Sequence, residues 1–539
     1  RVATTHYDGL GRAVSSEHTG PGGQTVADVS FAYDAVGRVV ATTQPGFGAA
    51  GAATFYDYDV LDRVIAATLP GQGRVHVRHY DRGLFERIDP NGNVVRQQHD
   101  AFGRIVRVEE VNGSDTYVTR YEHDVNDQLT RITDHHGNPS TVSYDRLGRR
   151  TRITDPDIGA RDFTYDANGN LLTERVGVLE TITWSYDELN RPRTKRGTSS
   201  RNWAASEIVW QYDKAPHGIG LLAARFDDTF HSYRVLAYDA LGRATREKTT
   251  LVVSGDGRPF VFENQYDPLG QLLSRKHPTG TLVSFGRDAR GYLTSITSGS
   301  GAPDASAIQW SADGRLTSWT GPGGVVTTAS YDADSRRLDA LQIDGPGPGL
   351  LADRAYRYDE ADRVTSVIDG AGARSVVVGY DPLDRLERST RLEAGVWRVR
   401  TNEYDAIGNL LCRDATGPDC AGGTRLDYPF AASDPLQRAT NHRATEVGGA
   451  ASAYGASGAV LTLGNRRFYY NAFARLTEVW DGSTLALRAS YDGNGRTHRL
   501  WSASAGETKY FPTDDFEWGE QSHEARVHVT LGGVRIATH

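Results

Sequence analysis

Short runs of β-branched and apolar residues recur along the whole chain, and turn-forming residues separate them. Residues 38–43 (RVVATT) and 104–109 (RIVRVE) are typical, each with partial alternation of apolar and polar positions. Runs of roughly six such residues have the length of strands and are too short for helices. No segment has a helical period. The pattern therefore predicts an all-β protein built from tandem antiparallel hairpins.

One kind of turn has a recurring phrase, seen at residues 144–149 as YDRLGR. Asp is favoured at the first position of a type I turn, and Gly at the fourth accepts the left-handed conformation that doubles the chain back. Tyr then ends the incoming strand, and Arg opens the outgoing one. We assign this structural role to Tyr7, Asp8, Gly11, Tyr33, Asp34, Gly37, Tyr144, Asp145, Gly148, Tyr238, Asp239, Gly242, Tyr491, Asp492 and Gly495.

Substitutions of the turn glycine follow the same logic. Most replacements tolerate positive φ, whereas Ser335 and Ala474 do not, so we expect those two turns to be distorted. The tolerant replacements are Asp62, Asp127, Asn190, Asp362 and Asp384.

A second turn of different chemistry lies midway through each repeat. Examples are residues 89–92 (DPNG), 135–138 (HHGN), 278–280 (PTG), 321–324 (GPGG) and 369–372 (DGAG). The commonest step between successive YD phrases is 21 residues, and the variation indicates loops of different length on a constant strand core. One repeat is thus one hairpin, and we expect hairpins to pair with their sequence neighbours. Sheet twist would make so long a ribbon coil.

Composition and charge fit a long extended sheet better than a globular domain with one core. The chain has 59 Gly and 20 Pro in 539 residues and is only 38% hydrophobic, which is little for one solid core. The chain contains no run of 18 apolar residues, so we predict no membrane span. The net charge of −8 with interspersed signs offers no basic stripe, so we expect no nucleic-acid partner.

The two cysteines, Cys412 and Cys420, flank a Gly-Pro turn. Two interpretations stay open. They form a disulfide across a hairpin, which would favour an oxidising compartment, or they are two free thiols in a surface loop.

The repeat rhythm loosens after Tyr404. We treat residues 1–539 as one repeat region in which 439–469 is an insertion or an irregular repeat. The chain begins with Arg1 and contains no Met, so we expect it to be an internal piece of a longer protein.

Candidate chemistry is sparse. Residues 166–170 (DANGN) begin like a calcium loop, but Leu171 and Gly177 replace the required Gly and Glu. His135 and His136 lie in a predicted turn without further ligands at metal spacing. The acidic residues near the end fit either a charged surface hairpin or paired carboxylates for acid–base work; they are Asp514, Asp515, Glu517 and Glu520. We predict no catalytic, cofactor-binding or metal residue and no enzyme.

The Y-D-x-x-G-R-L phrase, its period and the intervening P-x-G turns resemble the RHS (YD-repeat) proteins. That family includes bacterial polymorphic toxins, the B and C components of Tc toxin complexes and the animal teneurins. Residues 212–220 (YDKAPHGIG) look like a variant repeat of bacterial members, and residues 509–539 resemble the run-in to the family's core segment. The resemblance implies a spiralling sheet of hairpins around a hollow lumen that holds a C-terminal effector.

Self-cleaving members of the family use aspartates of the core segment, beside a D-P-x-G-x motif. Residues 267–270 (DPLG) instead form an ordinary repeat turn in mid-array. No catalytic residue is carried over.

Two functions follow from this resemblance. The first is a secreted or cell-surface bacterial shell around a toxic cargo, with toxin-complex subunits or a secretion apparatus as further partners. The second is a teneurin-like adhesion or glycan-binding surface, which requires an exposed cluster of aromatic rings. The residues that decide between them are Trp184, Trp203, Trp210, Trp310, Trp319 and Trp480.

Overall fold

The structure is a computed structural model. It describes residues 3–20, 23–177, 180–199, 205–227, 231–299, 301–347, 349–370, 374–393, 395–430, 439–455, 457–492 and 494–539. The chain divides into two compact units, which are described separately. Unit 1 comprises Arg1–Glu122, Gly286–Ile296 and Ala302–Thr424, and unit 2 comprises His123–Phe285, Thr297–Gly301 and Arg425–His539.

Each unit contains an early and a late group of strands, here called its early and late layers. The early layer of unit 1 consists of β1 (Ala3–Tyr7), β2 (Ala13–Thr19), β3 (Thr25–Tyr33), β4 (Val39–Thr43), β5 (Gly46–Phe47), β6 (Ala53–Tyr58), β7 (Val64–Thr68), β8 (Arg74–His79), β9 (Leu84–Ile88), β10 (Val94–His99), β11 (Ile105–Asn112) and β12 (Asp115–His123). Its late layer consists of β28 (Ser306–Trp310), β29 (Leu316–Thr320), β30 (Val326–Tyr331), β31 (Leu338–Asp344), β32 (Leu350–Tyr358), β33 (Val364–Asp369), β34 (Val376–Tyr380), β35 (Leu386–Glu393), β36 (Val396–Tyr404) and β37 (Leu410–Ala415).

Unit 2 is built in the same way. Its early layer consists of β13 (Leu129–Thr133), β14 (Pro139–Tyr144), β15 (Arg150–Asp155), β16 (Gly159–Tyr165), β17 (Leu171–Val176), β18 (Glu180–Tyr186), β19 (Pro192–Ser199), β20 (Ser206–Tyr212), β21 (Leu222–Asp227), β22 (Ser232–Tyr238), β23 (Ala244–Val253), β24 (Asp256–Tyr266), β25 (Leu272–Lys276) and β26 (Leu282–Arg287). Its late layer consists of β38 (Thr424–Asp427), β39 (Glu446–Val447), β40 (Ala450–Tyr454), β41 (Val460–Leu463), β42 (Arg466–Tyr470), β43 (Leu476–Asp481), β44 (Thr484–Tyr491), β45 (Thr497–Ser502), β46 (Glu507–Thr513), β47 (Phe516–Gly519), β48 (Ala525–Leu531) and β49 (Val534–Thr538).

The helical elements whose bounds the structure gives are two 3₁₀ turns, Asp81–Gly83 and Pro322–Gly324. β27 (Leu293–Ser298) begins in residues assigned to unit 1 and ends in residues assigned to unit 2. None of the described helical segments has the length and apolarity needed to cross a lipid bilayer. The all-β fold class predicted from the sequence is confirmed.

Within each layer, consecutive strands pair antiparallel, except that the short β5 pairs with β3 and β4 pairs with β6. Val142 of β14 faces Ile153 of β15, and the register shifts at Tyr144, where the turn begins. The same shift at the tyrosine recurs between β16 and β17 and between β44 and β45. It is a β-bulge of the kind that a type I turn followed by a left-handed residue produces in a hairpin. The expectation that hairpins pair with their sequence neighbours holds along both layers of each unit.

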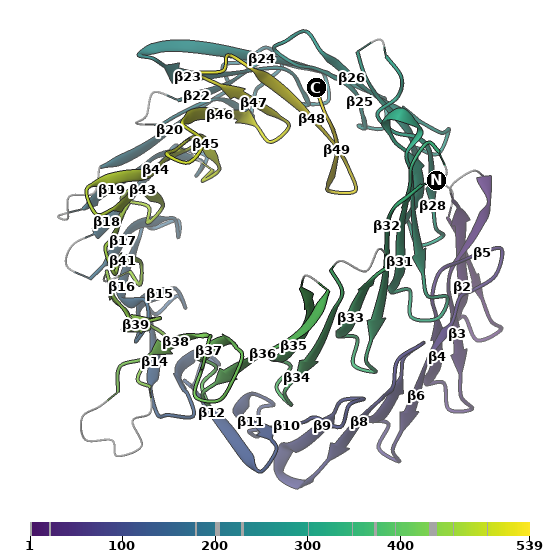
Figure 1. Ribbon diagram of the computed structural model, residues 1–539. Helices are drawn as coiled ribbons and strands as arrows, with labels where there is room; N and C mark the ends of the chain where they lie inside the picture. The colour runs from purple at the N-terminus through teal and green to yellow at the C-terminus, as the bar shows by residue number, and fades with distance from the viewer. Residues whose placement is uncertain are drawn as a thin grey trace. The chain divides into compact units, whose positions relative to one another are not determined.

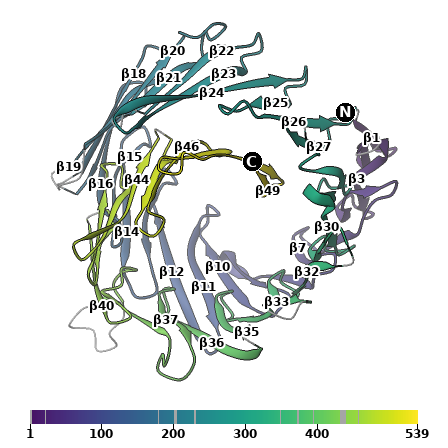
Figure 2. The same ribbon diagram turned by 45° about the horizontal axis from the view of Figure 1, so that its top comes forward.

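In both units the YD turns of the late layer lie against the mid-repeat turns of the early layer. In unit 1 the amide of Gly73 donates to the carbonyl of Glu360 at 3.2 Å. In unit 2 Gly458, in the turn after Tyr454, lies so close to Asp157 that a Cβ on the glycine would be 2.8 Å from the Asp157 carbonyl oxygen. Figures 1 and 2 show the yellow-green late strands of unit 2 beside its blue and teal early strands.

Buried apolar side chains are few, and their densest group lies near the C-terminus of unit 2. Phe262 of β24 meets Phe516 of β47 edge to face, with ring centroids 5.9 Å apart, and both side chains are fully buried. Tyr510, Trp518 and Val527 are buried in the same late strands. This contact joins the two layers of unit 2.

The five tolerant replacements of the turn glycine all have positive φ, between 61° and 73°. The turn at Ser335 contains one extra residue, because Asp332 pairs with Arg337 and the left-handed position passes to Arg336. The expected distortion at Ala474 is wrong. Ala474 adopts φ 58°, and the turn keeps the usual hydrogen bonds from Asn471 to Arg475 and from Ala474 to Asn471. The close fit of this turn against the early layer outweighs the local preference of alanine.

Residues 439–469 contain β39 to β41 of the late layer and most of β42. β40 pairs with β41 with a register shift at Tyr454, as in a YD hairpin. Residues 509–539 form the strands from β46 to β49.

Candidate functional site

The YD turn is a compact clasp built around its aspartate. Asp145 accepts hydrogen bonds at Oδ1 from the amides of Leu147 and Arg149, at 2.9 and 3.0 Å, and at Oδ2 from Arg149 Nε, at 2.7 Å. Gly148 has φ 79° and donates its amide to the carbonyl of Asp145. The bonds from the Arg149 amide and guanidinium lower the pKa of Asp145. The carboxylate thus fixes both the turn and the first residue of the next strand.

The same clasp forms at the other positions singled out in the sequence. Asp8, Asp34 and Asp239 each bond the arginine four residues later, through its amide and its Nε. Their turn glycines Gly11, Gly37 and Gly242 have φ between 76° and 96°.

The tyrosine hydroxyl of each clasp reaches back to the preceding hairpin. Tyr144 donates to the carbonyl of Leu129 at 2.9 Å, and Tyr33 donates to that of Ala13 at 2.8 Å. Tyr238 and Tyr491 make the equivalent bonds to Leu222 and Leu476. At one repeat the indole of Trp310 replaces the phenol and donates to Leu293 at 2.8 Å.

The arginine of each clasp reaches forward to the next repeat. The guanidinium of Arg149 lies 4.8 Å from the ring centre of Tyr165 and donates to the carbonyl of Asp166 at 3.0 Å. Arg385 makes the same two contacts with Tyr404 and Asp405. At these repeats the neighbour of the tyrosine ring is an arginine in a cation–π contact. A clasp that has both the tyrosine and the arginine therefore connects three consecutive hairpins.

The clasp at Asp492 differs from the others. Tyr491 and Gly495 occupy the usual places, and Asp492 accepts the amide of Arg496 at 2.9 Å. Its Oδ2, however, bonds Arg225 of the early layer at 3.0 Å, and both side chains are buried. Arg496 turns instead toward Pro512 and Asp514. A turn carboxylate is here used to bind the two layers together.

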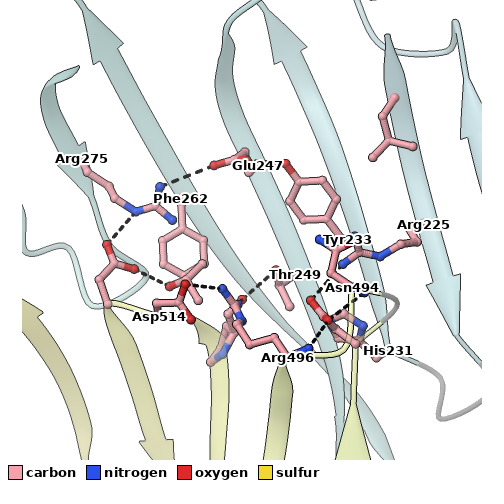
Figure 3. A pocket seen from close by; sticks show the side chains of 15 residues that line it. Arg225, His231, Tyr233, Glu247, Thr249, Phe262, Arg275, Asn494, Arg496 and Asp514 are labelled. Atoms are coloured by element: carbon pink, nitrogen blue, oxygen red, sulfur yellow. Dashed lines mark hydrogen bonds and ion pairs between the residues drawn. The ribbon is translucent and has the colours of Figure 1, made fainter. Parts of the chain in front are cut away.

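A polar pocket of about 530 Å³ lies beside this ion pair, between the two layers of unit 2. Figure 3 shows Arg225, Tyr233 and Glu247 on the pale teal early strands and Arg496 and Asp514 on the pale yellow late turns. Its lining comprises Leu222, Arg225, His231, Tyr233, Glu247, Thr249, Phe262, Arg275, Asp492, Asn494, Arg496, Pro512, Thr513, Asp514 and Asp515.

The charged groups of this pocket neutralise one another. Glu247 accepts a short hydrogen bond from Tyr233 and lies 3.6 Å from Arg275, which also contacts Asp515 at 3.1 Å. Burial raises the pKa of Tyr233, and the Glu247 carboxylate raises it further. Every carboxylate in the lining already has a cationic or hydroxyl partner. The pocket is therefore an ionic contact between the two layers of unit 2.

Asp227, His231 and His498, beside the pocket, lie close enough together to be considered as metal ligands. Their geometry fits a different role. Asp227 accepts the amide and the Nδ1 of His231 at 3.1 and 2.8 Å, which is the clasp pattern with histidine in place of arginine. The rings of His231 and His498 stack 4.6 Å apart at an angle of 13°, whereas ligands of one metal point their nitrogens at a common centre. Sequence reasoning missed this contact because 267 residues separate the two histidines.

The other candidates from the sequence are also structural. Asp166 forms an ordinary clasp with Asn170. His136 lies 2.9 Å from the carbonyl of Ala439 in the late layer. The acidic residues near the end do not form a single charged surface hairpin, because Glu517 is buried between Lys509, Arg526 and His528. In that group only Asp514 is largely exposed.

Cys412 and Cys420 are joined by a disulfide, with Cα atoms 5.7 Å apart. Cys412 lies on β37 and Cys420 in the loop that follows, and both are buried against Ala415. The bridge closes an irregular loop in unit 1.

Comparison with known proteins extends these observations. The RHS repeat model matches residues 7–46, 123–157, 144–178, 266–303 and 310–345, which fall in both units. No curated protein matches the sequence.

Solved Tc toxin structures match almost the whole chain. TcdB2-TccC3-TEV matches with TM-score 0.83 at 15% identity, over 98% of this chain and 32% of that one. TcdB2-TccC3 matches with TM-score 0.81 at 16% identity, over 98% and 32%. The Photorhabdus luminescens Tc holotoxin pore with a TccC3 mutation matches with TM-score 0.79 at 16% identity, over 98% and 31%. The chain spans about a third of the length of these solved chains.

The tandem hairpins, closed by their clasps, define a β-hairpin repeat protein. The structural match shows that it has the fold of those Tc toxin chains. RHS repeats are thus present in both units of the chain.

Proposed function

We propose that this chain is part of the wall of a secreted toxin-complex container, which encloses an effector domain. The observation that carries the proposal is the structural match to TcdB2-TccC3 over 98% of the chain. The effector would be encoded on the C-terminal side of this stretch, and other toxin-complex subunits would complete the wall. A secretion apparatus would be a further partner.

The contacts suit a wall that acts by confinement. Neighbouring hairpins are hydrogen-bonded to one another, and a clasp such as that of Asp145 adds a hydroxyl bond backward and a guanidinium contact forward. Stability is then summed along the array, as in other repeat proteins. The proposed role is not enzymatic, because the charged groups of the inter-layer pocket are held in ion pairs. The disulfide in unit 1 fits an oxidising, extracellular setting.

An adhesion or glycan-binding function is not favoured. That function needs aromatic rings gathered on an exposed patch. Trp184, Trp210, Trp310, Trp319 and Trp480 are all half-buried in their strands, and Trp203 lies outside the described residues. Trp310 and Trp480 also use their indole nitrogens within the protein.

Native proteolysis tests the container. The full-length protein, expressed from its gene, is treated with trypsin with and without a denaturant pulse, and surviving peptides are identified by mass spectrometry. We expect peptides outside the repeat region to survive in the native sample and to vanish after the pulse. Arg225→Ala, which removes an inter-layer ion pair, should speed their loss, whereas the exposed Arg152→Ala should not. Immediate digestion of everything beyond the repeats in the native protein would show that the wall encloses nothing.

A further inference from the structure

A lysine of unit 2 lies between two aromatic rings at the contact between the layers. The chain has only five lysines among its 60 Lys and Arg residues, and one of them is Lys195 of β19. Its ammonium lies 5.4 Å from the ring centre of Trp184, directly opposite on β18, and 4.5 Å from that of Phe473 in a late-layer turn. Ile208, its partner on β20, is buried. The contacts of this half-buried ammonium are therefore aromatic and aliphatic.

The late-layer turn beside Lys195 is a clasp without its carboxylate. Asn471 occupies the aspartate position, and its Oδ1 accepts the amides of Phe473 and Arg475 at 3.0 and 3.1 Å. A clasp aspartate would also bind the guanidinium with its second oxygen. Arg475 instead donates to the carbonyl of Asp492 at 3.0 Å. The Arg475 guanidinium lies 5.9 Å from the ring centre of Phe473, so one ring contacts both cations.

Neither of these two cations has a carboxylate partner. Among the residues that the structure describes, no carboxylate forms an ion pair with Lys195 or Arg475. Burial lowers the pKa of Lys195, and the positive charge of Arg475 lowers it further. Glu174 raises this pKa, but its carboxylate is already paired with Arg161 at 3.0 Å. An amine that is withdrawn from water near another cation is more often unprotonated, and the unprotonated amine is the nucleophile.

We propose that Lys195 is a site of reaction with carbon dioxide, which converts its amine to a carbamate. The lone pair of Nζ attacks the carbon of carbon dioxide and forms a C–N bond. One C–O π bond breaks, and its electron pair remains on that oxygen. A proton leaves the nitrogen for solvent, so the neutral amine becomes an anionic carbamate and no further reactant is needed. The inference does not depend on an enclosed cargo.

The product supplies the charge that the site lacks. A carbamate on Lys195 replaces two neighbouring cations by an anion and a cation, and Arg475 gains the partner that Asn471 does not offer. Carbon dioxide is small and apolar, which suits an amine between two rings. A bulky acyl donor or aldehyde would have to displace Phe473, and Gly197 packs so closely there that a Cβ would lie 3.0 Å from the ring. The modification would therefore strengthen the contact between the layers of unit 2.

Chemical trapping tests the proposal. The full-length protein is equilibrated with ¹³C-bicarbonate at neutral pH, alkylated with a trialkyloxonium salt that converts carbamates to stable esters, and analysed by peptide mass spectrometry. We expect a labelled ester at Lys195. Two lysines serve as internal controls, the exposed Lys214 and Lys509, which is paired with Glu517 at 3.3 Å. No ester at Lys195, or an equal yield at Lys214, would overturn the proposal.

A carbon NMR spectrum provides a second measurement on the same sample. The natural chain should give a carbamate signal. Lys195→Arg keeps a cation between the rings but removes the reacting amine, so the signal should disappear. A signal of the same intensity in Lys195→Arg would show that the reaction occurs elsewhere and would contradict the assignment.

Asn471→Asp separates the reactivity of Lys195 from the folding of the turn. Asp is the residue at this position in clasps such as that of Asp145, so the turn is retained. The new carboxylate should pair with Arg475 and raise the pKa of Lys195. A rise of one unit lowers the unprotonated fraction about tenfold, and the trapping yield should fall by about the same factor. An unchanged yield would show that the missing carboxylate does not make Lys195 reactive.

Discussion

The two units join their layers with different chemistry. In unit 1, Arg336 and Arg337 reach across to Gln44 and to backbone carbonyls of the early layer, so the contact is made of neutral acceptors at half-exposed positions. In unit 2 the contact contains the buried Arg225–Asp492 pair and the stacked His231 and His498. The same hairpin stacking therefore gives one contact that is insensitive to pH and one that depends on buried ionisable groups.

The largest expected difference between the units follows from removing one arginine from each contact. Arg225→Ala leaves Asp492 buried without its cation and should lower the free energy of unfolding of unit 2 by about 3–5 kcal/mol. Arg336→Ala removes hydrogen bonds to neutral groups at a half-exposed site and should cost about 1 kcal/mol. Hydrogen exchange in urea, resolved by peptide, measures both. Equal losses would contradict the distinction between the two contacts.

Acid should weaken unit 2 before unit 1. Burial, with the neighbouring His231, lowers the pKa of His498 to about 4, and burial lowers that of His277 to about 4. Since the unfolded histidines titrate near 6.5, the folded state binds fewer protons between these values, and stability falls as pH drops from about 6.5 to 4. The loss approaches 3 kcal/mol for each histidine.

Peptide-resolved hydrogen exchange at pH 7.5, 6 and 5 tests this order of events. The clasp aspartates have lowered pKa values, as at Asp34 and Asp145, so they keep their contribution above about pH 3.8 and lose it only below. Unit 1 should therefore stay protected at pH 5. His498→Gln should flatten the response of unit 2, and loss of protection in unit 1 first would contradict the prediction.

Reduction should act on unit 1. The Cys412–Cys420 bridge closes a loop with a sequence separation of 8, for which the chain-entropy model gives about 2–3 kcal/mol. Cys412→Ser with Cys420→Ser should lower the stability of β36 and β37 by this amount and leave unit 2 unchanged. Chemical denaturation with and without dithiothreitol measures the effect, and the double variant should no longer respond to the reductant.

The smallest effect should be the same in both units. Arg149→Ala in unit 2 and Arg363→Ala in unit 1 each remove one partly exposed clasp arginine. Each should cost about 0.5–1 kcal/mol, as expected for partly exposed ion pairs. Thermal unfolding of the two variants should agree. A clear difference would show that the clasps, and not only the layer contacts, distinguish the units.

The hairpins and their turns can be predicted from the sequence because the residues that determine each turn lie close together in the chain. Asp145, Gly148 and Arg149 lie within one turn, so residue preferences alone predict the hairpin and its bulge. The contacts between layers do not follow in this way. Arg225 and Asp492 look like an ordinary strand residue and an ordinary turn residue, and only the stacking of layers brings them together.

The same limit explains the error at Ala474. Its left-handed conformation is unfavourable locally, and it is held by a turn whose neighbours Ala472 and Phe473 pack against Gly197. Two apolar residues at the same position of their turns teach the converse. Leu147 and Phe473 are similar in the sequence, and their different exposure depends on what lies across the turn.

The tyrosine hydroxyl bonds run in one direction. In Tyr33, Tyr144, Tyr238 and Tyr491 the donor belongs to the later hairpin and the acceptor carbonyl to the hairpin before it. During synthesis on the ribosome, the acceptor carbonyl of each of these bonds is therefore made before the tyrosine that donates to it. The array is suited to growth by addition at its newest end, at the pace of translation.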